Sequence, residues 1–468
     1  MHTALTRLRL PALLVVLALS TSACWLGYGF DSANSRNAAW AGGISTTTAA
    51  DLTEVWRHDG VDGVTSTPVV FLDSVYFGGW DGTLRSVDTA TGALKWSTQL
   101  TSGSGAGVMV DASPTVHGDQ VFVGDGEGGF HALDRTTGAV NWSIQLDSHP
   151  QTRIFGSPVV VDGRIIVGVA SYELAIPKPD YTFRGAVVAL DPTSGAELWR
   201  TYMTDDDAES GAGVSVWSTA AVDTGRQMIF IGTGNTYEEP AAPMSDALAA
   251  LDYTTGDIVW LRQFTEGDVY TIFGTPPQGP DADIGAAPNL FSIDGRAVVG
   301  VGDKAGVYAA LDRDTGETVW ARQLTAGSHL GGVMMTAAFD AEAGTDGVIY
   351  VSSNVMVNAY DYANPANTSR TFALDASDGS IIWEVTIPAS SFGALTLANG
   401  VLFQPTTPGT LYALDTADGS ELWSEDLGAE LGGGVSVVDG TVFAPYGFWF
   451  FGSPANPLGG VIAFRPDT

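Results

Sequence analysis

The decapeptide LDRTTGAVNW, which runs from Leu133 to Trp142, occurs in seven versions along this chain and decides its fold. The other versions are VDTATGALKW (Val87 to Trp96), LDPTSGAELW (Leu190 to Trp199), LDYTTGDIVW (Leu251 to Trp260), LDRDTGETVW (Leu311 to Trp320), LDASDGSIIW (Leu374 to Trp383) and LDTADGSELW (Leu414 to Trp423). An eighth copy is divided between the two ends of the chain, with its Trp half at Leu52 to Trp56 and its apolar half at Gly460 to Phe464. Self-similarity of this kind is typical of a repeat architecture.

Each copy predicts two antiparallel strands joined by a tight turn. An apolar run that ends in Leu-Asp is followed by a polar stretch with Gly and then by a run that ends in Trp. The Asp can accept hydrogen bonds from turn amides, and Gly can adopt the positive φ that such a turn needs. Two more β-rich runs precede each hairpin, as in 66–70 and 75–79, so that one unit has the four strands of a propeller blade. The Trp ring is expected to stack over the turn of the neighbouring blade.

We therefore predict that residues 51–468 form one all-β, eight-bladed propeller with four-stranded antiparallel blades. The N-terminal strand around Trp56 should pair beside Val461 to Phe464, complete the last blade and close the ring, which removes the open sheet edge. Successive repeat Trp residues lie 40 to 63 residues apart, and the long intervals are in the middle of the chain. Insertions of this kind usually gather on the binding face of a repeat protein.

The first residues are typical of an export signal. Arg7 and Arg9 precede the apolar run Leu10 to Leu19, and the following Thr21-Ser-Ala-Cys24 resembles a bacterial lipoprotein cleavage box, with Thr21 where Leu is usual. Cys24 is the only cysteine in the chain, so no intrachain disulfide can form and lipidation explains the thiol best.

The expected order is thus a signal peptide over 1–23, a lipidated Cys24 with a flexible tether rich in Ala, Ser and Thr over 24–50, and the propeller. The mature protein would be exported and anchored by its lipid to a bacterial membrane, facing the periplasm or the cell surface. Plain secretion after Ala23 is the alternative.

Composition excludes several classes of function. The chain has 53 acidic and 20 basic residues, a net charge of −33, which argues against nucleic acid as a partner and favours a soluble acidic surface. One cysteine rules out Cys-based zinc sites and a covalently attached haem, and the six histidines show no ligand spacing. The motifs of zinc proteases, serine hydrolases and phosphate-binding loops are absent from the sequence.

Acidic and amide residues in the insertions are the remaining candidates for a site. Glu173 lies just past an expected strand end, Asn235 ends the strand and turn 230–235, and Asp283 and Lys304 follow in the next blade. Carboxylate and amide oxygens suit Ca²⁺. Spacing alone leaves Glu173 and Asp283 better explained as solvated loop acids, and Lys304 can equally pair with Asp303.

The repeats and the blade count resemble those of the pyrroloquinoline quinone (PQQ) dehydrogenase superfamily across 51–468. The same blades also occur in a non-catalytic lipoprotein scaffold of the outer-membrane assembly machinery. Five segments inside the insertions come in family order and are most similar to the polyvinyl alcohol dehydrogenase branch: Ser171 to Glu173, Phe183 to Asp191, Trp217 to Asp223, Gly232 to Asn235 and Asp283 to Leu290.

The resemblance implies roles for the candidate residues. It makes Glu173 and Asn235 ligands of Ca²⁺, and Asp283 the carboxylate that acts as general base and also approaches the metal. Lys304 corresponds to the cation that faces the quinone oxygen, and Asn354 to an amide that contacts the cofactor. In such a site Ca²⁺ acts as a Lewis acid, the carboxylate takes the alcohol proton, and the quinone accepts the hydride.

The sequence also departs from the family. Trp217 could stack on the flat quinone, but the stacking Trp of well-known members falls at Thr219 here, and Met335 stands where another Trp is common. The disulfide between adjacent cysteines beside the cofactor is impossible in this chain. Because no haem domain is recognisable, electrons would leave through a separate acceptor.

Two functions of different classes follow from these observations. The first is oxidation of an alcohol, with secondary and polymeric alcohols as candidates, outside the cytoplasm and dependent on PQQ and Ca²⁺. The second is a non-catalytic lipoprotein propeller that binds proteins as a scaffold in envelope assembly, and a sensor that binds PQQ without turnover is a weaker third. The enzyme requires that Glu173, Asn235, Asp283 and Lys304 converge at one end of the central channel.

Overall fold

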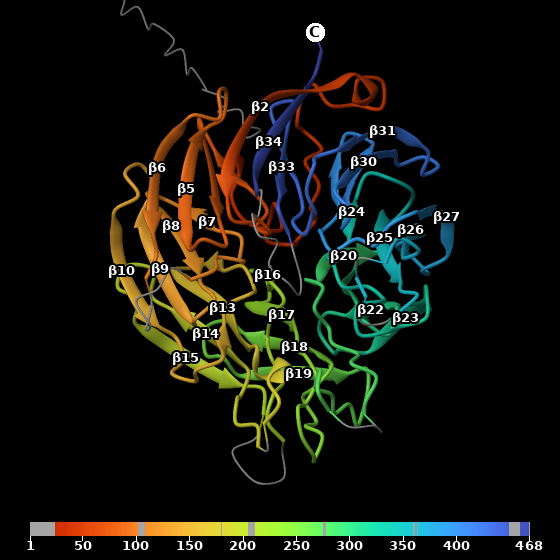
Figure 1. Cartoon of the computed structure of the whole chain (residues 1–468). Coiled ribbons are helices and arrows are strands. Elements are labelled where there is room, and N and C mark those ends of the chain that lie inside the picture. The colour runs from red at the N-terminus through yellow and green to blue at the C-terminus, as the bar shows by residue number, and fades with distance from the viewer. Residues whose placement is uncertain are drawn as a thin grey trace, which may run out of the picture.

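The computed structural model describes residues 24–101, 108–178, 180–204, 211–274, 278–358, 361–362, 364–448 and 459–467. These residues form eight antiparallel sheets arranged as a ring (Figure 1). The helical elements among them are two short 3₁₀ turns, η1 (Ala49–Asp51) and η2 (Glu173–Ala175). Within these ranges no helix has the length and apolar character needed to cross a bilayer. The predicted all-β, eight-bladed propeller is confirmed.

Each blade contributes four strands, ordered from the centre of the ring outward. The first four blades are β3 (Val69–Phe71), β4 (Ser74–Gly78), β5 (Thr83–Asp88) and β6 (Leu94–Gln99); β7 (Thr115–His117), β8 (Gln120–Gly124), β9 (Gly129–Asp134) and β10 (Val140–Gln145); β12 (Val159–Val161), β13 (Arg164–Ser171), β14 (Ala186–Leu190) and β15 (Glu197–Tyr202); and β16 (Ala221–Asp223), β17 (Met228–Gly232), β18 (Ala247–Asp252) and β19 (Ile258–Gln263).

The next four blades follow the same order. They are β20 (Asn289–Ile293), β21 (Arg296–Gly302), β22 (Val307–Asp312) and β23 (Thr318–Gln323); β24 (Ala338–Asp340), β25 (Val348–Val355), β26 (Thr368–Asp375) and β27 (Ile381–Ile387); β28 (Thr396–Ala398), β29 (Val401–Pro405), β30 (Thr410–Asp415) and β31 (Glu421–Asp426); and β32 (Ser436–Val438), β33 (Thr441–Tyr446), β34 (Gly459–Pro466) and β2 (Leu52–Val61). Two short strands, β1 (Cys24–Trp25) and β11 (Thr152–Arg153), extend blades 1 and 3.

The last blade joins the two ends of the folded ring. Strand β2 pairs antiparallel with β34, with Trp56 opposite Ala463. In Figure 1 the red-orange β2 lies beside the blue β34, which shows the pairing across the whole length of the chain. The predicted position of the N-terminal strand is therefore the one that the structure adopts.

The repeated decapeptide forms the hairpin between the third and fourth strand of each blade. In the first copy the Asp88 carboxylate accepts hydrogen bonds from the amides of Ala90 and Thr91, and Gly92 has a φ of +68°. These hairpins lie at the end of the ring where the innermost strands also finish, and we call this end the hairpin face. The opposite end, where the innermost strands begin, is the pocket face.

The repeat Trp connects each blade to the next. The ring of Trp142 packs on Gly195 in the following hairpin, where an added Cβ would lie 2.7 Å from Cε3, and its Nε1 donates to the carbonyl of Pro192 at 3.1 Å. The same bond from Nε1 to a carbonyl of the next blade recurs at Trp56, Trp96, Trp199, Trp260, Trp320, Trp383 and Trp423. All eight junctions thus share the Nε1 hydrogen bond, and seven of them also pack the ring on a glycine of positive φ.

The segment 24–50, which was expected to be a flexible tether, instead packs inside the ring. Strand β1 pairs with the innermost strand of blade 1, and Trp25 is completely buried. Further along, Ser32, Ala33 and Ser35 accept backbone hydrogen bonds at 2.7–2.9 Å from the innermost strands of blades 4, 5 and 6. Those strand edges would otherwise face one another unpaired across the centre, and the segment satisfies them. The predicted signal peptide over 1–23 lies outside the described residues.

Arg36 holds this internal segment in place. Its side chain is fully buried, and it donates to the carbonyls of Leu395 at 2.6 Å and Val435 at 3.1 Å and to the Thr396 hydroxyl at 2.8 Å. Burial lowers the pKa of Arg36 to about 10, which leaves the guanidinium charged at neutral pH. One side chain thereby ties the segment to blades 7 and 8.

The contact between Trp and Gly can be separated from the strain of a positive φ by a matched pair of variants. Gly195→Ala and Gly163→Ala place a Cβ at φ values of +72° and +71°, but only the first meets a Trp ring, while nothing lies within 4 Å of the second. We expect the free energy of unfolding to fall by about 1–3 kcal/mol more in Gly195→Ala, the usual cost of overpacking. Urea denaturation of both variants measures this difference, and equal losses would contradict the proposed role of the ring contact.

A second pair of variants tests the internal segment. Arg36→Met leaves buried carbonyls without a donor, and we expect a loss of at least about 2 kcal/mol in the free energy of unfolding. The control Arg370→Met removes a half-exposed ion pair with Glu384 and should change stability by less than about 1 kcal/mol. If both variants unfold alike, the segment does not contribute to the folded ring as described.

Candidate functional site

A cavity of about 550 Å³ opens at the pocket face. It is lined by residues that precede the innermost strands or follow the second strands of the blades, so every blade loop on this face can contribute a side chain. Four of the predicted site residues line it: Trp217, Asn235, Asp283 and Lys304. They come from separate loops of blades 4 and 5, which the ring brings together.

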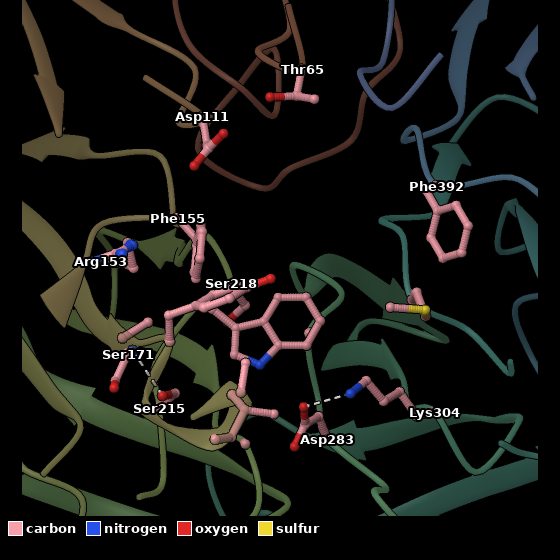
Figure 2. A pocket seen from close by; sticks show the side chains of 18 of the residues that line it. Thr65, Asp111, Arg153, Phe155, Ser171, Ser215, Ser218, Asp283, Lys304 and Phe392 are labelled. Atoms are coloured by element: carbon pink, nitrogen blue, oxygen red, sulfur yellow. Dashed lines mark hydrogen bonds and ion pairs between the residues drawn. The ribbon is translucent and has the colours of Figure 1, made fainter. Parts of the chain in front are cut away.

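Asp283 and Lys304 form the charged end of the cavity (Figure 2). Lys304 Nζ donates to Asp283 Oδ2 and to Asp281 Oδ1, both at 2.8 Å, so the buried ammonium lies between two carboxylates. The two acids and the Lys304 side chain are almost completely buried. His329 extends the cluster, with Nδ1 3.4 Å from Asp281 Oδ2 and its ring stacked on Tyr270. Asp281 was not predicted as a site residue. It lies two residues before the predicted Asp283, and this proximity in the sequence is the signal that could have identified it.

Burial dominates the electrostatics of Asp283. It raises the pKa of this carboxyl to about 6, although the nearby Lys304 ammonium acts in the opposite direction. The backbone amide of Asn235 also donates a hydrogen bond to Asp283 Oδ1 at 2.6 Å and stabilises the ionised form of the carboxyl. The result is a buried acid that ionises close to neutral pH, as a general base requires.

Trp217 provides a flat surface beside these charges. A Cβ added to Gly285 would lie 1.7 Å from Trp217 Cη2, so the indole packs directly on the Gly285 backbone. Lys304 Nζ lies 5.6 Å from the centre of the same ring, within range of a cation–π interaction. Thr219 and Met335, the two positions where the family resemblance led us to expect Trp, also line the cavity. The indole of Trp217 is a planar side chain beside the Asp283–Lys304 pair.

A second polar group lies away from this pair. Figure 2 places Thr65 and Asp111 at the other end of the view from Asp283 and Lys304, with Arg153 between. Burial raises the pKa of Asp111 to about 7 and lowers that of Arg153, whose guanidinium lies over the Tyr172 ring. No separate signal in the sequence points to these residues, because they lie in the ordinary loops of blades 1 to 3.

The remaining wall and the floor complete the cavity. Its apolar wall combines Leu330, Met334 and Phe392, which form one buried cluster. Its floor includes Tyr28, from the internal N-terminal segment, whose hydroxyl lies 2.8 Å from Thr336 Oγ1. A residue of the supposed tether thus contributes to the site, and its position follows only from the three-dimensional path of that segment.

Glu173 is placed differently from the other predicted ligands. Its carboxylate does not line the cavity, although its neighbours Tyr172 and Leu174 do. It is fully buried, forms an ion pair with Lys178, lies 3.2 Å from His149 Nε2, and accepts the Phe183 amide at 2.9 Å. Burial raises the pKa of Glu173, but these partners outweigh it and hold the pKa below its ordinary value.

Asn354 also lies outside the cavity lining. Its Nδ2 donates to the carbonyl of Ser391 at 2.9 Å, and its Oδ1 accepts the Ser391 amide at 2.9 Å. It therefore fixes the loop that carries Phe392, one residue of the apolar wall. Its predicted contact with a cofactor would be indirect in this arrangement.

Asp246 is a further buried acid that the sequence did not single out. The side chain is fully buried, and neither carboxylate oxygen has a hydrogen-bond partner. Burial and then the charge of Asp283 raise its pKa well above the ordinary value.

Groups of the protein engage the predicted calcium ligands in this structure. Lys178 and two backbone amides engage Glu173, while Asn235 donates its Nδ2 to the carbonyls of Thr236 and Tyr270. Across the described ranges, no set of three or more His, Cys, Asp or Glu side chains is arranged to hold a metal ion. A flat polyanionic cofactor fits better, because the Trp217–Gly285 surface lies beside Lys304 and Arg153 also lines the cavity.

Comparison with known proteins finds a family model that matches most of the chain and several curated relatives. A family model described as outer membrane protein assembly factor BamB matches residues 35–178, 184–364 and 303–466. A polyvinylalcohol dehydrogenase from a Pseudomonas species is 34% identical over 268 residues, which are 52% of this chain and 40% of that protein. The chain spans about two fifths of the length of the polyvinylalcohol dehydrogenases that it matches.

Two solved structures share the fold. The structure of quinohemoprotein alcohol dehydrogenase ADHIIG from Pseudomonas putida superposes with a TM-score of 0.81 at 18% identity, covering 95% of this chain and 80% of that one. BamB from Moraxella catarrhalis superposes with a TM-score of 0.57 at 15% identity, covering 88% and 97%. Because the sequence identities are this low, the two structures show a shared architecture and nothing more.

Proposed function

Since the chain belongs to the PQQ-like propeller family, the one whose model is described as outer membrane protein assembly factor BamB, we propose that it is a PQQ-dependent dehydrogenase that oxidises an alcohol. The observation that carries the proposal is the juxtaposition of Asp283, Lys304 and Trp217 in one cavity. Curated relatives named polyvinylalcohol dehydrogenase and quinohemoprotein alcohol dehydrogenase support it. Secondary and polymeric alcohols are the substrates that we propose.

The cavity residues divide the chemistry between them. Bound PQQ would supply the two-electron acceptor of the reaction. Lys304 would place a positive charge beside an electron-rich oxygen of that group, since Asp281 and Asp283 fix its ammonium on two sides. Trp217 would support the flat ring system through its face. Arg153 would attract one of the carboxylates of the cofactor.

Asp283 would take the proton from the substrate hydroxyl. The ionised carboxylate has lone pairs left after it accepts the Asn235 amide and Lys304, and it lines the cavity. The apolar wall around Met334 and Phe392 would exclude water while the carbon-bound hydrogen leaves as hydride. Electrons would then pass to a separate acceptor protein or dye.

We also propose that the protein is exported and that Cys24 is lipidated. Cys24, the first residue of β1, pairs with Phe71 of β3. Phe71 is the last residue of β3 and lies at the hairpin face. A lipid at this position would leave almost no free chain between membrane and propeller. It would hold the hairpin face toward the bilayer, and the cavity would open away from it.

Cofactor binding tests the flat surface directly. We expect Gly285→Ala to weaken PQQ binding at least about tenfold, or about 1.4 kcal/mol, because its Cβ displaces the Trp217 ring. Gly42→Ala is the control, since nothing lies within 4 Å of the added Cβ. Fluorescence quenching of the two variants and the wild type gives the dissociation constants. Absence of PQQ binding by the wild type would reject the enzyme and favour the scaffold.

Turnover tests the base. With PQQ, an artificial dye and a panel of secondary alcohols, kcat should fall as the pH drops through about 6, because the protonated Asp283 cannot accept a proton. Asp283→Asn should lower kcat at least about 100-fold. Asp303→Asn is the matched control: burial raises the pKa of Asp303 to about 6 as well, but this residue does not line the cavity. If Asp303→Asn abolishes the pH dependence and Asp283→Asn keeps it, the assigned base is wrong.

A further inference from the structure

Glu173 has no free oxygen to offer a metal ion. Oε2 accepts the Phe183 amide at 2.9 Å, both oxygens lie 3.2 Å from the Thr182 amide, and Oε1 forms the ion pair with Lys178 and approaches His149. An ionised carboxylate has about four lone-pair directions, and these donors use them. A Ca²⁺ ion binds through oxygen ligands, so at Glu173 it would have to displace the Lys178 ammonium from Oε1.

The partner of Glu173 is part of the same insertion. Lys178 follows Glu173 by five residues, and its ammonium reaches back to a carboxylate that is completely buried. The Lys178 side chain itself is 28% exposed, so the pair is covered by protein on the Glu173 side and reachable from solvent on the Lys178 side. A buried carboxylate requires a compensating charge, and here a lysine of the chain supplies it.

The other carboxylate that was predicted to approach the metal, Asp283, is also engaged by donors of the protein. Asp283 gives Oδ2 to the Lys304 ammonium and Oδ1 to the Asn235 amide. An ammonium therefore stands at each of the two carboxylates that were expected to share a divalent cation. The two ion pairs belong to different loops: Lys178 balances the charge of Glu173, whereas Lys304 is shared between Asp283 and Asp281.

We infer that the Lys178 ammonium takes the place of a divalent cation at Glu173, and that this chain binds its quinone cofactor without calcium. The Lys304 ammonium is then the positive group beside the cofactor, and Lys178 neutralises Glu173 outside the cavity. The part of this inference that concerns the cofactor rests on the proposed function, whereas the part that concerns calcium binding does not.

Calcium binding by the apoprotein tests the role of Lys178. We would titrate CaCl₂ into the full chain by calorimetry, and Tb³⁺ by Trp-sensitised luminescence, in the wild type, Glu173→Gln, Lys178→Met, Lys95→Met and the double variant Glu173→Gln with Lys178→Met. The wild type should show no saturable binding up to about 1 mM, the weak end of extracellular calcium sites. Lys178→Met should acquire a site of one ion, because it leaves Glu173 charged and uncompensated.

The two controls separate the site from general effects. Lys95→Met removes an ion pair with Asp73 on the hairpin face and should bind no ion. The double variant carries no charge at either position, so it should fold and show no site. Saturable calcium binding by the wild type that Glu173→Gln abolishes would overturn the inference, and this comparison remains decisive even if Lys178→Met does not fold.

PQQ binding with and without a chelator tests the second part. The wild-type dissociation constant should stay within about twofold when EDTA replaces CaCl₂. A loss of affinity of tenfold or more on chelation would overturn the inference while leaving the proposed function intact. Failure to bind PQQ under either condition would reject the proposed function and, with it, the cofactor part, but the calcium titrations would still decide the role of Lys178.

Discussion

The contact of a Trp ring with a glycine of the next blade is the constraint on which the rest of this structure depends. A propeller blade has no core of its own and is stable only when it packs against two neighbours. Seven of the eight junctions place the indole on a positive-φ glycine, as at Trp142 and Gly195, and all eight have the Nε1 bond to the adjacent blade. Because the junctions share this geometry, the angle between blades is repeated and the ring closes. The loops of distant blades then meet at one end.

Closure leaves the innermost strand edges facing the centre, and the N-terminal segment occupies this space. The backbone groups that it pairs belong to blades on several sides of the ring, so the segment also couples blades that do not touch one another. Arg36 and Tyr28 lie on this one stretch, the first fixing it to blades 7 and 8 and the second forming part of the cavity floor. Ring stability and the shape of the site are therefore linked through residues 24–50.

The repeated blades could be predicted from the sequence, but only part of the segments outside the repeats could. The decapeptide specified hairpin, blade and closure, because each depends on contacts within one unit or between identical units. Residues 24–50 were misjudged because their Ala, Ser and Thr composition resembles a linker, whereas their burial depends on strand edges hundreds of residues away. The convergence of Asn235, Asp283 and Lys304 was anticipated from family order, but the Lys178 ion pair with Glu173 depends on the path of one insertion, which spacing does not encode.

The charged end of the cavity combines two requirements that oppose each other. With Asp283 ionised, Lys304 is surrounded by two carboxylates, so the cluster carries a net negative charge within a chain whose overall charge is −33. That state suits proton abstraction but repels the carboxylates of a polyanionic cofactor. Protonation of Asp283 leaves Lys304 paired with Asp281 alone and relieves the repulsion while it removes the base. Because burial raises the pKa of Asp283 to about 6, the proposed dehydrogenase would show opposite responses of cofactor affinity and turnover rate to pH.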